Sequence, residues 1–243
     1  MFARIAPRYD LLNHLLSLNI DRSWRRRAVR RMRLHPGAKV LDICTGTGDL
    51  ALEVRKVVSP AEGGLVVGTD FTPEMLRIAR RKGRRLEALH FVMADALELP
   101  FRSSCFDAVT VSFGIRNVRF LERCLDEMLR VLVPGGVAAI LEFSALKGGW
   151  IGRAFHFYFH HILPRIGGWV SGSAQGREAY AYLPRSVEGF PSPAALLIAL
   201  RNRGFTEVRS KAFTFGIAVL HLANRPGGAQ PAAIEEVGGG GTP

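Results

Sequence analysis

The residues best suited to hold a ligand lie at positions 40–49, in the sequence Val-Leu-Asp-Ile-Cys-Thr-Gly-Thr-Gly-Asp. An apolar strand is expected over residues 39–43, followed by a turn with Gly46 and Gly48 and by a helix over about residues 49–58. Glycine tolerates positive φ and lets a ligand approach the backbone, because it has no Cβ. A strand, a glycine turn and a helix in this order favour a nucleotide-like ligand.

The polar residues around this turn indicate which class of nucleotide-like ligand it could bind. Thr47 and Asp49 can donate or accept hydrogen bonds, and the unpaired N–H groups of the following helix point toward the turn. The turn lacks the Gly-Lys-Ser/Thr ending of a phosphate cradle, and it lacks the third glycine of the dinucleotide fingerprint. Asp42 and Asp70 end two expected strands. They indicate a ligand rich in hydroxyl and amino groups, with a cationic ligand as a further alternative.

A polar residue stands at the carboxyl end of each of the first four expected strands. Thr47 follows the first strand, Asp70 ends the second, Asp95 and Ala96 follow the third, and Ser112 ends the fourth. Ligands of open α/β sheets bind at this edge. We therefore expect Asp70 to bind both hydroxyls of a ribose and Asp95 to bind the polar edge of a purine. Simpler roles stay open, in which Asp70 caps the next helix and Ser112 is a turn residue.

Strands alternate with helices along the chain, and this order positions the polar residues. Such spacing implies right-handed β-α-β crossovers and a mainly parallel sheet. Thr72 is expected to cap a helix that has Pro73 in its first turn, and Pro134-Gly-Gly136 is expected to turn the chain into the fifth strand. The expected strands cover residues 39–43, 65–70, 89–93, 106–112, 137–143, 207–212 and 216–224, and the expected helices cover 49–58, 73–82, 120–131 and 193–203.

The chain is predicted to form one main domain with additions, because 243 residues with 48% hydrophobic content can bury a full core. We expect a helical lid over residues 1–36 and a main domain over 37–224. A helical insertion is expected at about 147–192, and a disordered Gly/Pro/Ala-rich tail over 225–243.

The chain is strongly basic, with 33 Lys and Arg against 21 Asp and Glu and a net charge of +12. Much of the excess lies in residues 22–33 and 77–85. Three interpretations stay open: solvated helix faces, an anionic membrane surface, to which each basic residue contributes on the order of 1 kcal/mol, and nucleic acid. Three cysteines without C-x-x-C spacing fit a reducing compartment, and no signal peptide or membrane-spanning run is visible.

Further motifs occur along residues 2–224 of the chain. They are Asp42-x-x-x-Gly-x-Gly, Asp70, Ala94-Asp-Ala, Tyr9-Asp-x-Leu-Asn13-x-x-Leu-Ser17 with Trp24, Ser112-Phe-Gly-Ile-Arg-Asn117, Arg130-Val-Leu-Val-Pro-Gly-Gly136, Glu142-Phe-Ser144 and Phe190-Pro191. Together these motifs resemble those of class I S-adenosylmethionine-dependent methyltransferases. More narrowly, the chain resembles the quinone-biosynthesis C-methyltransferases, which methylate demethylmenaquinol and its ubiquinone-pathway counterpart.

The resemblance implies a Rossmann-like α/β fold, with a seven-stranded, mostly parallel sheet, helices on both faces and an α-helical lid. It implies S-adenosylmethionine as methyl donor, no metal, and a polyprenyl quinol as substrate, foremost demethylmenaquinol and also the ubiquinone-pathway benzoquinol. From the basic clusters we further expect a cytoplasmic protein held peripherally at the inner face of an anionic membrane. The residues expected to bind the cofactor are Thr47, Asp70, Asp95, Ala96 and Ser112, together with Gly46 and Gly48 of the turn.

Catalysis would be assigned to the loop after the fourth strand, beside the expected place of the methyl group. We expect Arg116 and Asn117 to orient or polarise the quinol oxygens, with Arg116 stabilising a phenolate or ordering a water that acts as base. The alternative is that Arg116 only holds the loop through an ion pair. Tyr9, Asn13 and Tyr182 are further candidates from the lid elements.

An aromatic segment at residues 150–163 carries histidines that could suggest a metal. His156 and His160 have the spacing of one helix face, and His161 is adjacent. No Glu stands between them as in H-E-x-x-H, and no acidic or cysteine ligand follows nearby, so no metal is expected. The segment is expected to line a channel for an isoprenoid tail, to face lipid, or to pack in the core.

Two other function classes stay open. The net charge of +12 is compatible with a nucleic-acid methyltransferase, but Ser112-Phe-Gly-Ile stands where such enzymes often have Asn/Asp-Pro-Pro-Tyr/Phe. No nucleic-acid partner is therefore expected. The second alternative is a non-catalytic S-adenosylmethionine-binding subunit of a quinone-synthesis complex. A homodimer is also left open.

Overall fold

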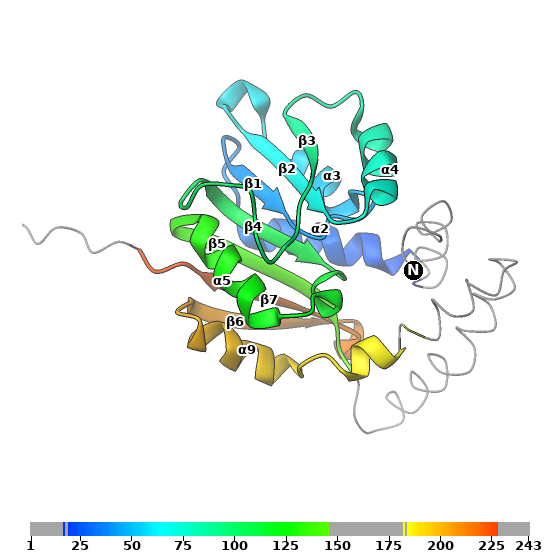
Figure 1. Ribbon diagram of the computed structural model, residues 1–243, viewed down its shortest axis with the longest axis vertical. Coiled ribbons are helices and arrows are strands. Elements are labelled where there is room, and N and C mark those ends of the chain that lie inside the picture. Colours follow the sequence, from blue (N-terminus) through cyan, green and yellow to red (C-terminus); the bar gives the residue numbers. More distant parts are fainter. Residues whose placement is uncertain (1–16, 18, 146–181, 183, 228–243) are drawn as a thin grey trace, which may run out of the picture.

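The computed structural model describes residues 17, 19–145, 182 and 184–227, which form a seven-stranded sheet with helices on both faces (Figure 1). The strand order is β3-β2-β1-β4-β5-β7-β6. The strands from β3 to β5 in this order run parallel, and β7 is antiparallel to both β5 and β6. The strands are β1 (Lys39–Asp42), β2 (Leu65–Asp70), β3 (Leu89–Met93), β4 (Phe106–Ser112), β5 (Leu132–Phe143), β6 (Thr206–Phe213) and β7 (Ala218–Asn224).

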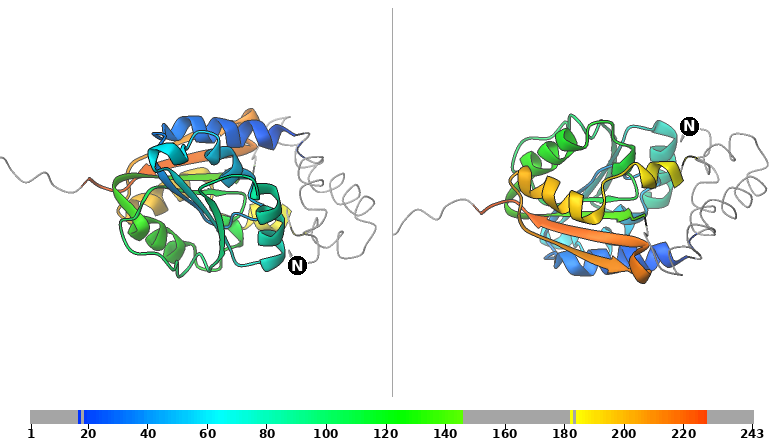
Figure 2. Two further views of the ribbon diagram at one scale, coloured as in Figure 1. Left: turned by 90° about the horizontal axis from the view of Figure 1, so that it is seen from above. Right: turned by 90° about the horizontal axis from the view of Figure 1, so that it is seen from below.

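Helices cover both faces of the sheet, and Figure 2 shows α2 and α5 on opposite sides of it. One apolar cluster joins the first face to α2, α3 and α4, and a second cluster joins the other face to α5 and α9. The mostly parallel α/β fold expected from the sequence is therefore confirmed. The helices are α2 (Ile20–Met32), α3 (Asp49–Arg55), α4 (Pro73–Gly83), α5 (Leu121–Val131) and α9 (Pro193–Asn202).

The central strands are apolar on both faces, which explains why they read as continuous apolar runs. Val40 and Leu41 are both fully buried, yet they belong to different clusters, because successive side chains of a strand point to opposite faces. A parallel sheet covered by helices on both sides requires this composition.

Most element boundaries agree with those expected, but α3 is shorter. It ends at Arg55, before the expected Val58. Ser59 precedes Pro60 and has extended backbone angles, φ −106° and ψ 120°, as is usual for a residue before proline. The Arg55 guanidinium then bonds to the carbonyl of Val58 at 2.7 Å, which holds the chain in a turn after the helix.

The expected turn at Pro134-Gly-Gly136 is part of β5, which starts at Leu132 rather than Val137. The turn-forming residues produce a shift in register instead of a break: Leu132 pairs with Phe106, and the regular pairing resumes at Val137. The φ of Gly135 is +80°, which supplies the local distortion.

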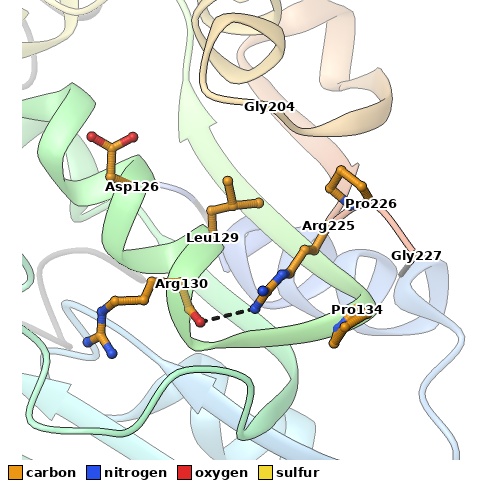
Figure 3. A pocket seen from close by; sticks show the side chains of 8 residues that line it. All are labelled: Asp126, Leu129, Arg130, Pro134, Gly204, Arg225, Pro226 and Gly227. Atoms are coloured by element: carbon orange, nitrogen blue, oxygen red, sulfur yellow. Dashed lines mark hydrogen bonds between the residues drawn. The ribbon is translucent and has the colours of Figure 1, made fainter. Parts of the chain in front are cut away.

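A hollow lies near the beginning of β5, at the end of the sheet opposite the glycine turn (Figure 3). Arg225, one of its two lining arginines, is held by structural hydrogen bonds: Nη1 donates to Ser104 Oγ at 2.9 Å and to the carbonyls of Arg130, at 3.1 Å, and Leu132. The Arg130 carbonyl belongs to the last turn of α5 and Leu132 directly follows the helix, where a cation is favourable. Arg225 therefore connects the end of β7 to the end of α5, and the hollow lies away from the predicted ligand edge.

The predicted lid and tail fall mainly outside the described residues. Of residues 1–36 the structure shows α2, which buries Trp24, Ala28, Val29 and Met32 against the core. The lid, the insertion at about 147–192 and the tail stay predictions. In the part of the chain that the structure describes, no helix combines the length and apolar character needed to cross a membrane.

Candidate functional site

The predicted binding residues lie at the carboxyl ends of β1, β2, β3 and β4, which are neighbours in the sheet. The glycine turn follows β1, which pairs with β2 on one side and with β4 on the other. From β1 the chain first adds β2 and β3 on one side of the sheet and then places β4 on the other side. The connections after β1 and β4 therefore diverge, and such a switch point opens a crevice for a ligand.

The two glycines of the turn are needed for different reasons. Gly46 has φ +56° and Gly48 has φ +86°, both in the region that favours glycine. A Cβ at Gly46 would meet nothing within 4 Å, so this side of the turn is open to a ligand. A Cβ at Gly48 would lie 2.9 Å from Phe91 and 3.1 Å from Ala79, so Gly48 permits close packing of α3.

Asp70 links the glycine turn to α4. Its Oδ2 accepts from the Gly46 N–H at 2.8 Å, and its Oδ1 accepts from the Thr72 N–H at 2.8 Å. Asp70 therefore takes part in capping α4, which was the alternative role considered for it. The Thr72 side chain, which was expected to cap this helix, makes no capping hydrogen bond. A carboxylate has about four acceptor positions. Each oxygen of the half-buried Asp70 thus retains capacity to accept another hydrogen bond, as two adjacent ribose hydroxyls require.

Thr47 and Ser112 both lie on the β1 side of this carboxylate: Thr47 follows β1, the neighbour of β2, and Ser112 ends β4, the next strand beyond β1. Thr47 is buried, with its Oγ1 accepting from Lys82 Nζ at 3.1 Å, and Lys82 is also paired with Asp49 at 2.7 Å. Ser112 is half-buried at the last position of β4. Thr47 therefore belongs to a charged group that joins α3 to α4.

Asp95 and Ala96 follow β3 beside two apolar residues that sequence reasoning missed. Asp95 is exposed, and its Oδ1 accepts from the Leu97 N–H at 2.9 Å. Phe71, directly after Asp70, is 75% exposed, and Met93, the last residue of β3, is 62% exposed. Large apolar side chains open to solvent at strand ends suit a planar ring. Their positions in the sequence, beside Asp70 and close to Asp95, could have identified them as candidate ligand contacts.

Asp42 points into the core and not toward the predicted ligand edge, so its expected part in ligand binding was wrong. Its side chain is 1% exposed and accepts hydrogen bonds from the hydroxyls of Thr45 at 2.5 Å and Thr110 at 2.7 Å. Burial raises the pKa of Asp42 from 3.8 to about 6, against the lowering effect of these two hydroxyls and of Arg25. Asp42 thus fixes the start of the turn from inside the core.

The raised pKa makes a prediction for folding stability. A folded-state pKa above the unfolded value favours the protonated carboxyl, so its stabilising contribution is present below about pH 4 and is lost as pH rises through about 6. We expect the unfolding free energy of the wild type, relative to Asp42→Asn, to fall by about 2.5 kcal/mol between about pH 4 and pH 7.5. Urea titrations of both proteins across this range measure the difference, in which the other titrating groups cancel. A difference independent of pH would contradict the prediction.

Arg116 is held in an ion pair with a residue whose role sequence reasoning missed. It lies in the short helix η2 (Ile115–Asn117), and its Nη1 is 2.8 Å from Glu142 Oε1. The two side chains are 6% and 1% exposed. Nη1 also donates to the Phe113 carbonyl, and Nε donates to Ser186 Oγ at 3.3 Å. Burial raises the pKa of Glu142 although Arg116 opposes the shift. The loop-holding ion pair considered as the alternative role is therefore present.

Asn117 lies beside Arg116 and contacts a predicted lid residue. The hydroxyl of Tyr182 donates to Asn117 Oδ1 at 3.1 Å. Tyr9, Asn13, His156, His160 and His161 lie outside the described residues. Within residues 19–145 and 184–227, no three His, Cys, Asp or Glu side chains are grouped to hold a metal ion.

Comparison with known proteins identifies relatives over nearly the whole chain. A demethylmenaquinone methyltransferase of Thermus thermophilus is 49% identical, covering 93% of this chain and 100% of the relative. One of Deinococcus radiodurans is 47% identical, covering 93% and 91%. A ubiquinone/menaquinone biosynthesis C-methyltransferase of a Geobacter species is 46% identical, covering 93% and 94%.

Solved structures support the fold. An S-adenosylmethionine-dependent methyltransferase of Thermotoga maritima matches with a TM-score of 0.64 at 18% identity, covering 92% of this chain and 97% of the other. One of Aquifex aeolicus matches with a TM-score of 0.61 at 18% identity, covering 83% and 89%. The family model of the ubiE/COQ5 methyltransferases matches residues 1–225, and the chain belongs to this family.

Proposed function

We propose that the protein transfers the methyl group of S-adenosylmethionine to a ring carbon of a polyprenyl quinol, converting demethylmenaquinol to menaquinol. The ubiquinone-pathway benzoquinol is the second substrate to be tested. The observation that carries the proposal is the group of polar residues around the open turn at Gly46, in a chain that matches demethylmenaquinone methyltransferases over most of its length. Family membership supports an active methyltransferase over a non-catalytic subunit.

The described residues fit the proposed cofactor. Asp70 has acceptor capacity for the two ribose hydroxyls, and the open side of Gly46 allows close approach to the backbone. Asp95 and Ala96 would bind the polar edge of the adenine, with Phe71 and Met93 beside its ring. Ser112 and Thr47 would contact the rest of the S-adenosylmethionine molecule. Gly48 allows α3 to pack close to Phe91 of β3. When bound, S-adenosylmethionine supplies a methyl group made electrophilic by the positive charge on sulfur.

The residues after β4 would prepare the acceptor. A ring carbon is a weak nucleophile, but loss of a proton from a quinol hydroxyl increases the electron density on the ring. We assign to Arg116 and Asn117 the binding of the quinol oxygens, with Arg116 favouring the phenolate by its charge. Among the described residues, the bonds of Arg116 engage Nε and Nη1 and leave Nη2 for this role. Orientation of the ring carbon contributes on the order of 7–11 kcal/mol in an ideal case.

The basic face of α2 supports contact with an anionic membrane, where a polyprenyl substrate would be found. The helix buries its apolar side together with Arg25 in the core and presents its other arginines to solvent. Each contributes on the order of 1 kcal/mol near an anionic surface. We therefore place the protein peripherally at the inner face of the membrane. The exposed residues are Arg22, Arg26, Arg27, Arg30 and Arg31 of α2, followed by Arg33.

The test of the proposed function is methyl transfer from labelled S-adenosylmethionine to chemically reduced demethylmenaquinol, with the oxidised quinone and RNA as controls. We expect label in the reduced quinol alone, because only the reduced ring is electron-rich. Label in RNA alone would overturn the substrate assignment. Binding to anionic vesicles that weakens with salt, without binding to neutral vesicles, tests the membrane contact separately.

A further inference from the structure

Arg25 is the buried arginine of the basic helix α2. Its side chain is 10% exposed, whereas that of the neighbouring Arg26 is 58% exposed. Its Nη1 is paired with the buried carboxylate of Asp21 and lies 3.6 Å from Asp49 Oδ2. Arg25 therefore belongs to the interior charges of the protein rather than to the basic surface.

One donor of this buried guanidinium has no partner. The Nε of Arg25 is inaccessible to solvent and makes no hydrogen bond. An unpaired buried donor of a charged group is costly, because it has lost water without gaining another acceptor. Nε and the adjacent Nη2 form one edge of the guanidinium, and this edge matches the two oxygens of a carboxylate. A ligand carboxylate at this edge would supply the missing acceptor.

The position of Arg25 indicates which ligand group this is. Asp49 is the first residue of α3 and directly follows the glycine turn. The guanidinium carbon of Arg25 also lies 5.4 Å from the centroid of the Phe113 ring, and Phe113 directly follows Ser112 at the end of β4. Arg25 is thus placed between the glycine turn and the end of β4. The ribose-binding residue Asp70 lies on the other side of the turn, after β2.

We propose that Arg25 binds the carboxylate of the methionine half of S-adenosylmethionine through its Nε edge. The Asp49 carboxylate, 3.6 Å from the guanidinium, provides a negative charge that suits the ammonium of the same amino acid. This inference rests on the cofactor of the proposed function and extends it, since Asp70, Asp95 and Ala96 serve the adenosine half. Arg25 acts as a positioning residue, because fixing the amino acid end sets the direction of the sulfonium methyl.

The test compares binding of S-adenosylhomocysteine, its decarboxylated analogue and 5′-methylthioadenosine, measured by calorimetry. For the wild type we expect removal of the carboxylate to weaken binding about 10- to 100-fold, as for a charge-assisted pair. In Arg25→Gln, S-adenosylhomocysteine should bind about 10- to 100-fold more weakly. The decarboxylated analogue should bind this variant as it binds the wild type. Arg26→Gln, on the exposed face of the same helix, should retain the wild-type preference.

Arg25→Gln removes the positive charge paired with the buried Asp21, so the double variant Asp21→Asn with Arg25→Gln is measured in parallel. The affinity ratio of the two analogues decides the question, since it does not depend on the folded fraction. An unchanged ratio in both variants would overturn the role of Arg25 and leave the cofactor assignment intact. A wild type that binds neither S-adenosylhomocysteine nor 5′-methylthioadenosine would overturn the cofactor site and this inference together.

Discussion

Asp70→Asn is expected to bind S-adenosylhomocysteine about 100-fold more weakly than the wild type, because two charge-assisted hydrogen bonds to ribose would be weakened or lost. The carboxylate already accepts the N–H groups of Gly46 and Thr72. An asparagine has one oxygen in place of two, and its NH₂ would face one of these donors. The variant therefore cannot serve the turn, the helix and the ribose at once.

The effect on ribose must be separated from the effect on the turn. Asp107→Asn is a matched control, because Asp107 also accepts a backbone N–H, from Lys39 at 2.7 Å, at the other end of the sheet. A 2′-deoxyribose analogue of S-adenosylhomocysteine completes a double-mutant cycle. The wild type should lose affinity for this analogue, and Asp70→Asn should not discriminate against it. Binding by Asp70→Asn within about threefold of Asp107→Asn would contradict the assignment.

The sequence predicted the sheet well where polar residues end apolar runs. β2, β3 and β4 begin and end at the expected residues, and β4 ends at Ser112. Errors occurred where tertiary contacts override local signals. Pro134-Gly-Gly136 has turn chemistry, yet pairing with β4 and the bonds between Arg225 and Gly135 and Gly136 extend β5 through it.

The sequence predicted that the candidate residues lie at strand ends, but it did not predict the direction of every side chain. The chain positions of Asp42 and Asp70 are equivalent, because each ends a strand, yet Asp42 points into the core and bonds to Thr110, 68 residues away. No local pattern contains that partner. The bond between Arg116 and Glu142 joins two strand ends in the same way. These side-chain pairs form between residues far apart in the sequence, on strands that become neighbours only in the folded sheet.

The burial of Arg25 could have been predicted from the spacing of apolar residues in α2, but the many neighbouring arginines obscured this pattern. The buried residues of α2 include Trp24, Arg25, Ala28, Val29 and Met32, which recur at helical spacing. Arg25 occupies this buried stripe, although the surrounding arginines made it look like part of a solvated face. Periodicity is therefore more informative than charge count when a helix is dominated by one residue type.

The buried pair of Arg116 and Glu142 leads to the second large effect. Arg116→Gln is expected to lower kcat for the reduced quinol by on the order of 10³-fold, if a donor to the developing phenolate is removed. Its affinity for S-adenosylhomocysteine should stay unchanged, since the residues proposed to bind the adenosine and the amino acid lie elsewhere. The same substitution should lower stability by about 3–5 kcal/mol, because Glu142 would remain buried without its partner.

The loss of stability and the loss of catalysis are separated by a second variant. Arg116→Gln combined with Glu142→Gln removes both charges, so most of the stability should return. If Arg116 contacts the quinol, turnover stays low in this double variant, and Glu142→Gln alone retains far more activity than either protein without Arg116. Recovery of near wild-type turnover in the double variant would show that Arg116 only supports the loop. Single-turnover rates with reduced quinol, together with melting temperatures of all four proteins, distinguish a residue that acts on the substrate from one that only holds the loop.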